Sequence, residues 1–164
     1  MQERLWSPWR SQYIEGPKGL EGDGACVFCT KANDVQRDAE RMVVLRGKTA
    51  YACMNLFPYN AGHLLVNPYR HVAGLEELTT DEYRELFEMV RDSQALLVRA
   101  LSPGGFNIGI NLGAAAGAGI AGHLHVHVIP RWGGDTNFMP TAAEVRVISQ
   151  NMQDCYDRIL RARA

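Results

Sequence analysis

The sequence predicts an α+β domain in which short antiparallel strands pack against an amphipathic helix. Several runs of apolar residues are short, and glycine, proline and asparagine separate them. Runs of this kind are typical of strands joined by turns, whereas βαβ units would place helices between them. One longer segment repeats its apolar residues with the period of a helix. With 164 residues, 46% of them hydrophobic, the chain has the length and the apolar content of one domain.

The first three strands are expected in the first half of the chain. Residues 42–45 are apolar and are followed by a turn at Gly47, and residues 50–54 alternate loosely. A loop rich in asparagine, proline and glycine leads to a third run at 63–67, which ends at Pro68. Their close spacing predicts an antiparallel meander.

A helix is predicted to begin after Thr79. Thr79 and Glu82 have the spacing of a capping box, in which each side chain accepts a backbone hydrogen at the helix start. The apolar residues then recur at helical spacing until Pro103 and its glycines end the helix. These apolar residues are Tyr83, Leu86, Phe87, Val90, Leu97, Val98 and Leu101.

Three more elements are expected in the second half of the chain. Residues 106–112 alternate around small residues and predict a fourth strand. Residues 144–148 predict an extended segment. A last helix is predicted over residues 150–162, with Ser149 as its N-cap.

The most informative stretch is residues 122–130, which predicts a fifth strand. Every second position from 123 to 127 is a histidine, and these are three of the five histidines of the chain. Leucine and valine occupy the positions between them. Because successive side chains of a strand point to opposite faces, the three imidazoles share one face while the apolar residues face the core. Ionisable groups cluster in this way mostly at functional sites. The three histidines are His123, His125 and His127.

Composition excludes several classes of protein. The formal charge is −1 and charges of both signs are interspersed, which argues against nucleic acid or a membrane surface as a partner. No apolar run approaches the roughly 18 residues that cross a bilayer, and the first residues do not resemble a signal peptide. The four cysteines do not form the pattern of a secreted disulfide framework. We therefore expect a cytoplasmic protein.

Cys26 and Cys29 form a Cys-x-x-Cys pair, which is either half of a zinc site or a redox motif. A redox pair usually follows a strand, and no strand is predicted before Cys26, so zinc is favoured. A structural zinc ion needs four ligands, and the histidines are candidates for the other two. Buried free thiols are the alternative.

His125 is the best candidate for a nucleophile. A neutral imidazole attacks phosphorus readily and is available at neutral pH. Residues 113–122 form a loop of glycine, alanine and one isoleucine just before the histidines, and its backbone N–H groups, with the amide of Asn111, are suited to hold phosphoryl oxygens. A second imidazole is expected to fix the tautomer of His125 or to protonate the leaving oxygen. In the competing interpretation His123 and His125 both bind zinc.

Several motifs together resemble the histidine triad superfamily. The pattern from His123 to Ile129 matches the family signature, and so do Asn55…Pro58…Gly62-His63, residues 66–72 and Asn111-Leu112-Gly113. The tryptophan-rich start and residues 134–139 are similar to the bacterial branch of diadenosine tetraphosphate phosphorylases and adenylyltransferases. The chain departs from many members at Gly119-Ile120, where they carry Gln-Ser or Gln-Thr.

The resemblance implies an α+β fold with an antiparallel sheet of about five strands, usually assembled as a homodimer. It implies that His125 attacks the α-phosphorus of a nucleotide, such as a dinucleoside polyphosphate, and forms a nucleotidyl-histidine. His127 and His63 would support the phosphate site. The substrate would contact Asn55, Asn111, Gly117, Ala118 and Gly119, besides His125 and His127. By the same resemblance a structural zinc ion would be held by Cys26, Cys29, His71 and His123.

We therefore expect an N-terminal arm over residues 1–24, a nucleotide-binding catalytic domain over residues 25–132 and a C-terminal extension with a helix over residues 133–164. The favoured function is nucleotidyl transfer or hydrolysis on dinucleoside polyphosphates. The alternatives are a metal-dependent hydrolase and a nucleotide-binding module without turnover.

Overall fold

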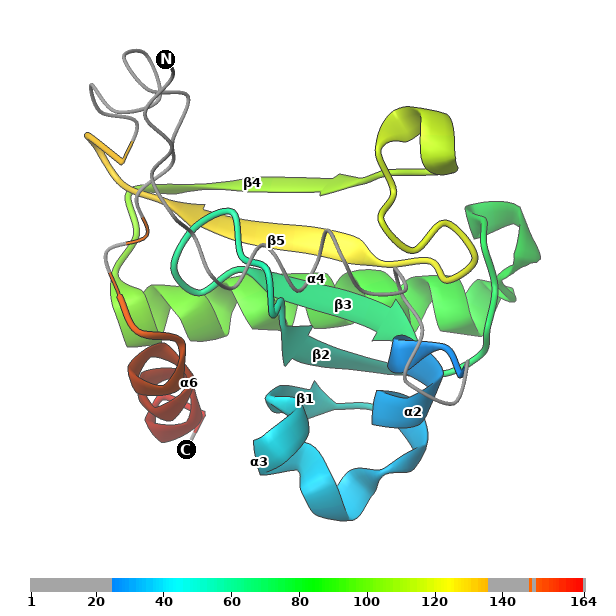
Figure 1. Cartoon of the computed structure of the whole chain (residues 1–164), viewed down its shortest axis with the longest axis horizontal. Helices are drawn as coiled ribbons and strands as arrows, with labels where there is room; N and C mark the ends of the chain where they lie inside the picture. Colours follow the sequence, from blue (N-terminus) through cyan, green and yellow to red (C-terminus); the bar gives the residue numbers. More distant parts are fainter. Residues whose placement is uncertain (1–24, 136–147, 149, 164) are drawn as a thin grey trace, which may run out of the picture.

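A single antiparallel sheet forms the centre of the computed structural model, which describes residues 25–135, 148 and 150–163 (Figure 1). The spatial order of the strands is β1-β2-β3-β5-β4, and all neighbours are antiparallel. The predicted sheet of about five antiparallel strands is thus confirmed. The first three strands form the predicted antiparallel meander, and β5 then lies between β3 and β4. The strands are β1 (Val43–Arg46), β2 (Ala50–Met54), β3 (Leu64–Pro68), β4 (Gly105–Ile110) and β5 (Val126–Arg131).

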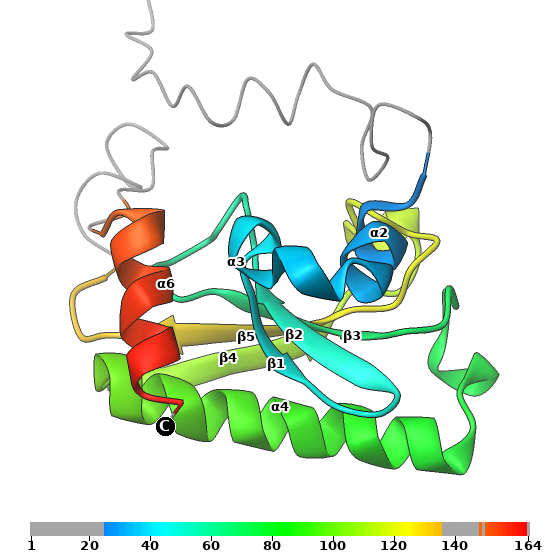
Figure 2. The same cartoon turned by 90° about the horizontal axis from the view of Figure 1, so that it is seen from below.

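The long helix α4 (Thr80–Leu101) connects β3 to β4 and covers one face of the sheet (Figure 2). Its predicted start is confirmed: the N–H of Glu82 donates to the Thr79 hydroxyl at 3.3 Å, and the N–H of Thr79 donates to the Glu82 carboxylate at 2.8 Å. The apolar side of α4 packs on the strand residues whose side chains face it, which occupy every second position. Among these are Ala52, Val66, Val126 and Val128, all nearly inaccessible to solvent.

Short helices cover part of the opposite face, and the sequence did not predict them. They are α2 (Val27–Asn33) and α3 (Asp38–Arg41), joined by the 3₁₀ helix η1 (Val35–Arg37). Phe28 of α2 packs into a second apolar cluster with Tyr51, Cys53 and Leu65. This cluster holds α2 above the face of the sheet that also carries the histidines. Two further 3₁₀ turns are η2 (Leu75–Glu77) and η3 (Ala114–Ala116).

The last helix, α6 (Met152–Arg161), packs on α4 and β1 at one end of the sheet (Figures 1 and 2). The prediction of its start was wrong by two residues. Asn151 is the N-cap, because its side-chain oxygen accepts the N–H of Gln153 at 2.8 Å. The predicted cap, Ser149, lies outside the described residues, as do the predicted arm at 1–24 and residues 144–147. No helix in the described part of the chain has both the length and the apolar character needed to cross a membrane.

Candidate active site and metal centre

The histidine strand is shorter than the sequence indicated. β5 begins at Val126, so only His127 lies in the ladder, whereas His123 and His125 precede it. The reason is that the N–H of Leu124 donates to the carbonyl of Val72, at 2.6 Å, and not to a neighbouring strand. The alternation itself is confirmed: Leu124 and Val126 enter the core beneath α4, and the imidazoles take the other face.

His125 is held in one tautomer by the main chain. Its Nδ1 lies 2.8 Å from the carbonyl oxygen of His123. A carbonyl oxygen only accepts hydrogen bonds, so Nδ1 carries the proton and Nε2 keeps a free lone pair. The expectation that a second imidazole fixes this tautomer was wrong, because the main chain does so. His125 is 6% exposed, and burial lowers its pKa. Nε2 is therefore unprotonated at neutral pH, with its lone pair available for nucleophilic attack.

His63 and His127, beside His125, form a hydrogen bond in which donor and acceptor can be assigned. The N–H of Tyr59 donates to Nδ1 of His63 at 3.1 Å. Because a backbone N–H can only donate, Nδ1 of His63 accepts and its Nε2 carries the proton. That Nε2 lies 2.9 Å from Nδ1 of His127, which must accept in turn. The proton of neutral His127 is thereby placed on Nε2.

Nε2 of His127 is buried and has no hydrogen-bond partner among the described residues. A buried donor without an acceptor costs about 1–3 kcal/mol, so an unpaired one in a native site calls for an incoming acceptor. The ring of His127 lies 5.0 Å from the ring of His125, centroid to centroid. The site therefore offers one nucleophilic nitrogen and one N–H donor side by side, which suits attack on an atom that bears oxygens.

Burial keeps the imidazole rings of His63 and His127 neutral. Burial, with a smaller contribution from charge on the neighbouring imidazoles, lowers the pKa of His63 to about 3 and that of His127 to about 4. Protonation of either ring would break the donor-to-acceptor order that starts at Tyr59. The low pKa values keep that order intact throughout the neutral range.

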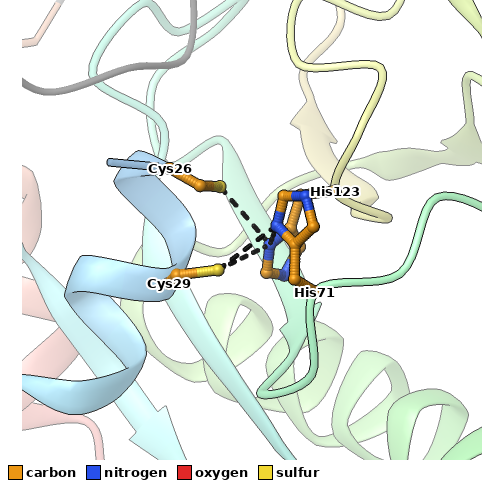
Figure 3. A group of neighbouring side chains, drawn as sticks. All are labelled: Cys26, Cys29, His71 and His123. Carbon is orange, nitrogen blue, oxygen red and sulfur yellow. Dashed lines mark hydrogen bonds between the residues drawn. The ribbon is translucent and has the colours of Figure 1, made fainter. Parts of the chain in front are cut away.

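A second cluster, of two cysteines and two histidines, lies at the start of α2 (Figure 3). The ligand atoms of these four residues all lie within 4.8 Å of one another. Nδ1 of His123 is 3.5 Å from both sulfur atoms and 3.3 Å from Nδ1 of His71. The structure thus brings together all four residues that the resemblance implied, and they could hold a metal ion. They are Cys26, Cys29, His71 and His123.

The donor chemistry of the cluster fits a cation. Nε2 of His123 donates to the carbonyl of Pro68 at 3.0 Å, which leaves its Nδ1 as a lone-pair donor toward the sulfurs. Burial, with the neighbouring Cys26, raises the pKa of Cys29 to about 11 when no cation is present, so metal binding would release its proton. The competing interpretation, with His123 and His125 on one metal, is not the arrangement observed, because the cluster groups His123 with Cys26, Cys29 and His71 and does not include His125.

Of the other predicted substrate-binding residues, Asn55 contacts the histidine site directly. Asn55 accepts the N–H of Phe57 at 2.9 Å, and its amide nitrogen lies 3.3 Å from Nδ1 of His63. Asn111 lies beside Gly117, whose φ of +86° suits glycine.

Two of the predicted N–H groups of the glycine loop donate within the loop itself. Those of Gly117 and Ala118 donate to the carbonyls of Ala114 and Gly113, at 3.0 and 3.4 Å. The role of Asn55, Asn111 and residues 117–119 in holding substrate stays a prediction.

Comparison with known proteins gives the family. The sequence profile of the HIT domain family matches residues 36–134, and the chain belongs to this family. It is 43% identical over 155 residues to a protein of Mycobacterium tuberculosis named AP-4-A phosphorylase, covering 93% of this chain and 80% of that protein. It is also 43% identical over 89 residues to the bis(5'-nucleosyl)-tetraphosphatase (asymmetrical) of Schizosaccharomyces pombe, covering 54% of this chain and 48% of that one.

Solved structures of the family share the fold. A hypothetical histidine triad nucleotide-binding protein from Sulfolobus tokodaii superposes with a TM-score of 0.66 at 27% identity, covering 84% of this chain and 91% of that chain. A zinc-bound histidine triad family protein from Mycobacterium smegmatis superposes with a TM-score of 0.62 at 25% identity, covering 86% and 94%.

Sequence reasoning missed three groups that shape the site. They are the carbonyl of His123, the N–H of Tyr59 and the side chain of Phe28, whose ring lies 5.3 Å from that of His123 and 5.2 Å from that of His125. Backbone groups leave no trace in residue identity, so no pattern signals the first two. Phe28, between two cysteines, was the one visible cue.

Proposed function

We propose that this protein cleaves dinucleoside polyphosphates, such as diadenosine tetraphosphate, through a nucleotidyl-histidine intermediate on His125. The observation that carries the proposal is the pairing of a free Nε2 on His125 with an unpartnered Nε2–H donor on His127. The names of two relatives, AP-4-A phosphorylase and bis(5'-nucleosyl)-tetraphosphatase, support the same substrate class.

The two groups divide the work of a phosphorus displacement. Nε2 of His125 attacks the α-phosphorus with its lone pair, forming a P–N bond as the P–O bond to the leaving polyphosphate breaks. The Nε2–H of His127 donates to an oxygen of the reacting phosphate, where charge develops. In the second step an oxygen of water or inorganic phosphate attacks the same phosphorus, the P–N bond breaks, and the nucleotide leaves with His125 restored.

Product analysis tests the proposal. Diadenosine tetraphosphate is incubated with the protein in buffers with and without inorganic phosphate, and the nucleotides are separated. ADP with ATP, formed only when phosphate is present, is the result expected of a phosphorylase. AMP with ATP in both buffers is the result expected of a hydrolase, and either result supports nucleotidyl transfer. An intact substrate in both buffers contradicts the proposal.

We further propose that the ion of the cysteine–histidine cluster is a structural zinc. Tetrahedral zinc, with bonds of about 2.3 Å to sulfur and 2.0–2.1 Å to nitrogen, separates sulfur from nitrogen by about 3.5 Å and nitrogen from nitrogen by about 3.3 Å. The separations of His123 from Cys26 and Cys29, 3.5 Å each, and from His71, 3.3 Å, support this geometry. Bound zinc would tie α2 to the segment that carries the triad.

A homodimer through β4 is part of the proposal. β4 is an edge strand, and Ile108 on it and Leu112 just beyond it are each 45% exposed. A strand edge with apolar side chains favours pairing with another strand, and a second copy of the chain supplies an identical one. Sedimentation velocity is expected to give a dimer for the native chain and a monomer for Ile108→Lys. A native monomer at micromolar concentration contradicts it. Cytoplasmic location stays a prediction from the sequence.

A further inference from the structure

We propose that Asp135 is a positioning residue, which acts through Asn60 to fix the tautomers of His63 and His127. This inference rests on the proposed function for its catalytic consequence, but the proton arrangement itself can be measured without any substrate. Asp135 lies just after β5, and Asn60 lies in the turn before His63. Their influence depends on a chain of hydrogen bonds that begins just after β5 and ends at the unpartnered Nε2 of His127.

Asp135 fastens the segment that follows β5. Its carboxylate accepts hydrogen bonds from Nε and one terminal nitrogen of Arg131, at 2.6 and 2.7 Å. It also accepts one from the N–H of Trp132 at 3.2 Å. Arg131 is also held from the edge strand, because its other terminal nitrogen donates to Asn107 at 2.6 Å. The Asp135 side chain is only 12% exposed. Charge-assisted and bidentate bonds of this kind are strong and hold a carboxylate in one orientation.

Asn60 connects that carboxylate to the turn before His63. Its amide nitrogen donates to Asp135 at 2.8 Å and to the carbonyl of Pro130 at 3.0 Å. Its side-chain oxygen accepts the N–H of Ala61 at 3.2 Å, and its carbonyl accepts the N–H of His63 at 3.2 Å. One residue thus holds the turn closed from inside and ties it to the end of β5.

The closed turn places the N–H of Tyr59 on Nδ1 of His63. The turn needs the left-handed backbone of Gly62, with φ of +72°, to bring the chain back toward β3. Inside it, the ring of Tyr59 stacks on that of His63, with centroids 5.0 Å apart and planes 28° from parallel. Two donors make Nδ1 an acceptor, the Tyr59 N–H at 3.1 Å and the side-chain amide of Asn55 at 3.3 Å. Together they decide which nitrogen of His63 carries the proton.

Opening of the turn would reverse the direction of the hydrogen bond between His63 and His127. If the turn opens, Tyr59 no longer donates, and Asn55 loses the N–H of Phe57 that orients its amide and can turn its oxygen toward His63. His63 can then carry its proton on Nδ1 and present Nε2 as an acceptor. Nδ1 of His127 would then become the donor in their 2.9 Å contact, and Nε2 of His127 would carry a lone pair. A lone pair repels a phosphoryl oxygen, whereas an N–H binds it. Asp135 and Asn60 therefore act on the rate of the chemical step through the direction of this one hydrogen bond.

Ring-nitrogen NMR measures the inference directly. The native protein, Asp135→Ala, Asn60→Ala and the double variant are labelled with ¹⁵N-histidine, and long-range proton–nitrogen spectra identify the tautomers. The native protein is expected to show His63 and His127 with the proton on Nε2. Each single variant is expected to show a mixture of tautomers at both residues, and the double variant the same mixture. Glu85→Ala is the matched control, because Glu85 also fastens a turn by accepting backbone N–H groups, those of Lys48 and Thr49, away from the histidines.

Steady-state kinetics measures the consequence. With diadenosine tetraphosphate, kcat is expected to fall roughly tenfold in each single variant and no further in the double variant, with KM changed less than about twofold. Glu85→Ala is expected to lower the unfolding temperature and leave kcat unchanged. If Asp135→Ala does not fold, Asn60→Asp takes its place, because it removes the donor and sets two carboxylates against each other.

Folded variants with native tautomers would overturn the inference, and so would native kcat in those variants. A native protein that does not cleave the substrate would contradict the proposed function alone. In that case the tautomer spectra would still decide the role of Asp135 and Asn60.

Discussion

The carbonyl oxygen of His123 accepts the Nδ1 proton of His125 at 2.8 Å, while the imidazole of His123 belongs to the cysteine–histidine cluster. One residue therefore contributes its side chain to the candidate metal centre and its main chain to the candidate active site. A histidine that ligates a metal has a fixed backbone, and this backbone presents the carbonyl that sets the tautomer of His125. The two candidate sites therefore share His123.

Replacement of the proposed nucleophile is expected to separate chemistry from binding. His125→Ala should abolish turnover of diadenosine tetraphosphate and leave nucleotide affinity within about tenfold, roughly 1.4 kcal/mol. The reason is that the variant removes the attacking nitrogen and leaves His127 and its donor in place. Calorimetric titration with a nucleotide and a product assay give the two values. Unchanged turnover would contradict the assignment of His125.

Removal of metal is expected to act on stability first. Elemental analysis should find about one zinc ion per chain, and none in Cys26→Ser/Cys29→Ser. A chelator should lower the unfolding temperature, with activity lost only as the chain loosens, because no metal takes part in the proposed chemistry. Immediate loss of activity in a chain that stays folded would instead favour the metal-dependent hydrolase. A fully folded native preparation without metal would count against the zinc site.

The pH dependence of stability is expected to carry the signature of buried neutral histidines. The pKa values of His63, about 3, and His127, about 4, lie below the ordinary 6.5. Below pH 6.5 the unfolded chain binds protons that the folded chain does not, so the free energy of unfolding should fall as the pH falls from 6.5 toward 4. The slope is about 1.4 kcal/mol per pH unit for each histidine. Urea unfolding at pH 7, 6 and 5 measures it.

The matched variant for this measurement is His63→Gln, which should reduce the slope by about one proton. Its stability at pH 5 relative to pH 7 should therefore fall less than that of the native chain. Equal slopes for the two proteins would show that His63 titrates normally.

Phe28 is expected to support both sites at once. It is 4% exposed and its ring packs on those of His123 and His125. Phe28→Ala should lower the free energy of unfolding by about 3–5 kcal/mol through the cavity it leaves, and should lower metal content as α2 loosens. Phe87→Ala is the control, since Phe87 is 37% exposed on α4 and should cost less than about 1 kcal/mol. Similar losses in the two variants would contradict a supporting role for Phe28.

Periodicity predicted the elements of this fold well. The alternation of histidines with aliphatic residues gave the correct faces of β5, and the Thr79–Glu82 capping box gave the start of α4. Both signals are local, because a side chain's direction in a strand and a helix's first hydrogen bonds depend on residues close in sequence. The boundaries were less accurate. β5 begins three residues after His123, since the N–H of Leu124 bonds to Val72, a partner that no local pattern indicates.

By itself, then, the sequence determined which residues are candidates for chemistry: three alternating histidines on one face and a cysteine pair. The family signature it also carries is confirmed by the match to the HIT domain. Only the tertiary structure decided which groups each of them contacts. Nδ1 of His125 meets a carbonyl, Nδ1 of His63 meets a backbone N–H, and His71 meets Cys29 across 42 residues of chain. A hydrogen bond depends on where a donor and an acceptor lie in space, and the folded chain alone brings these distant groups within reach.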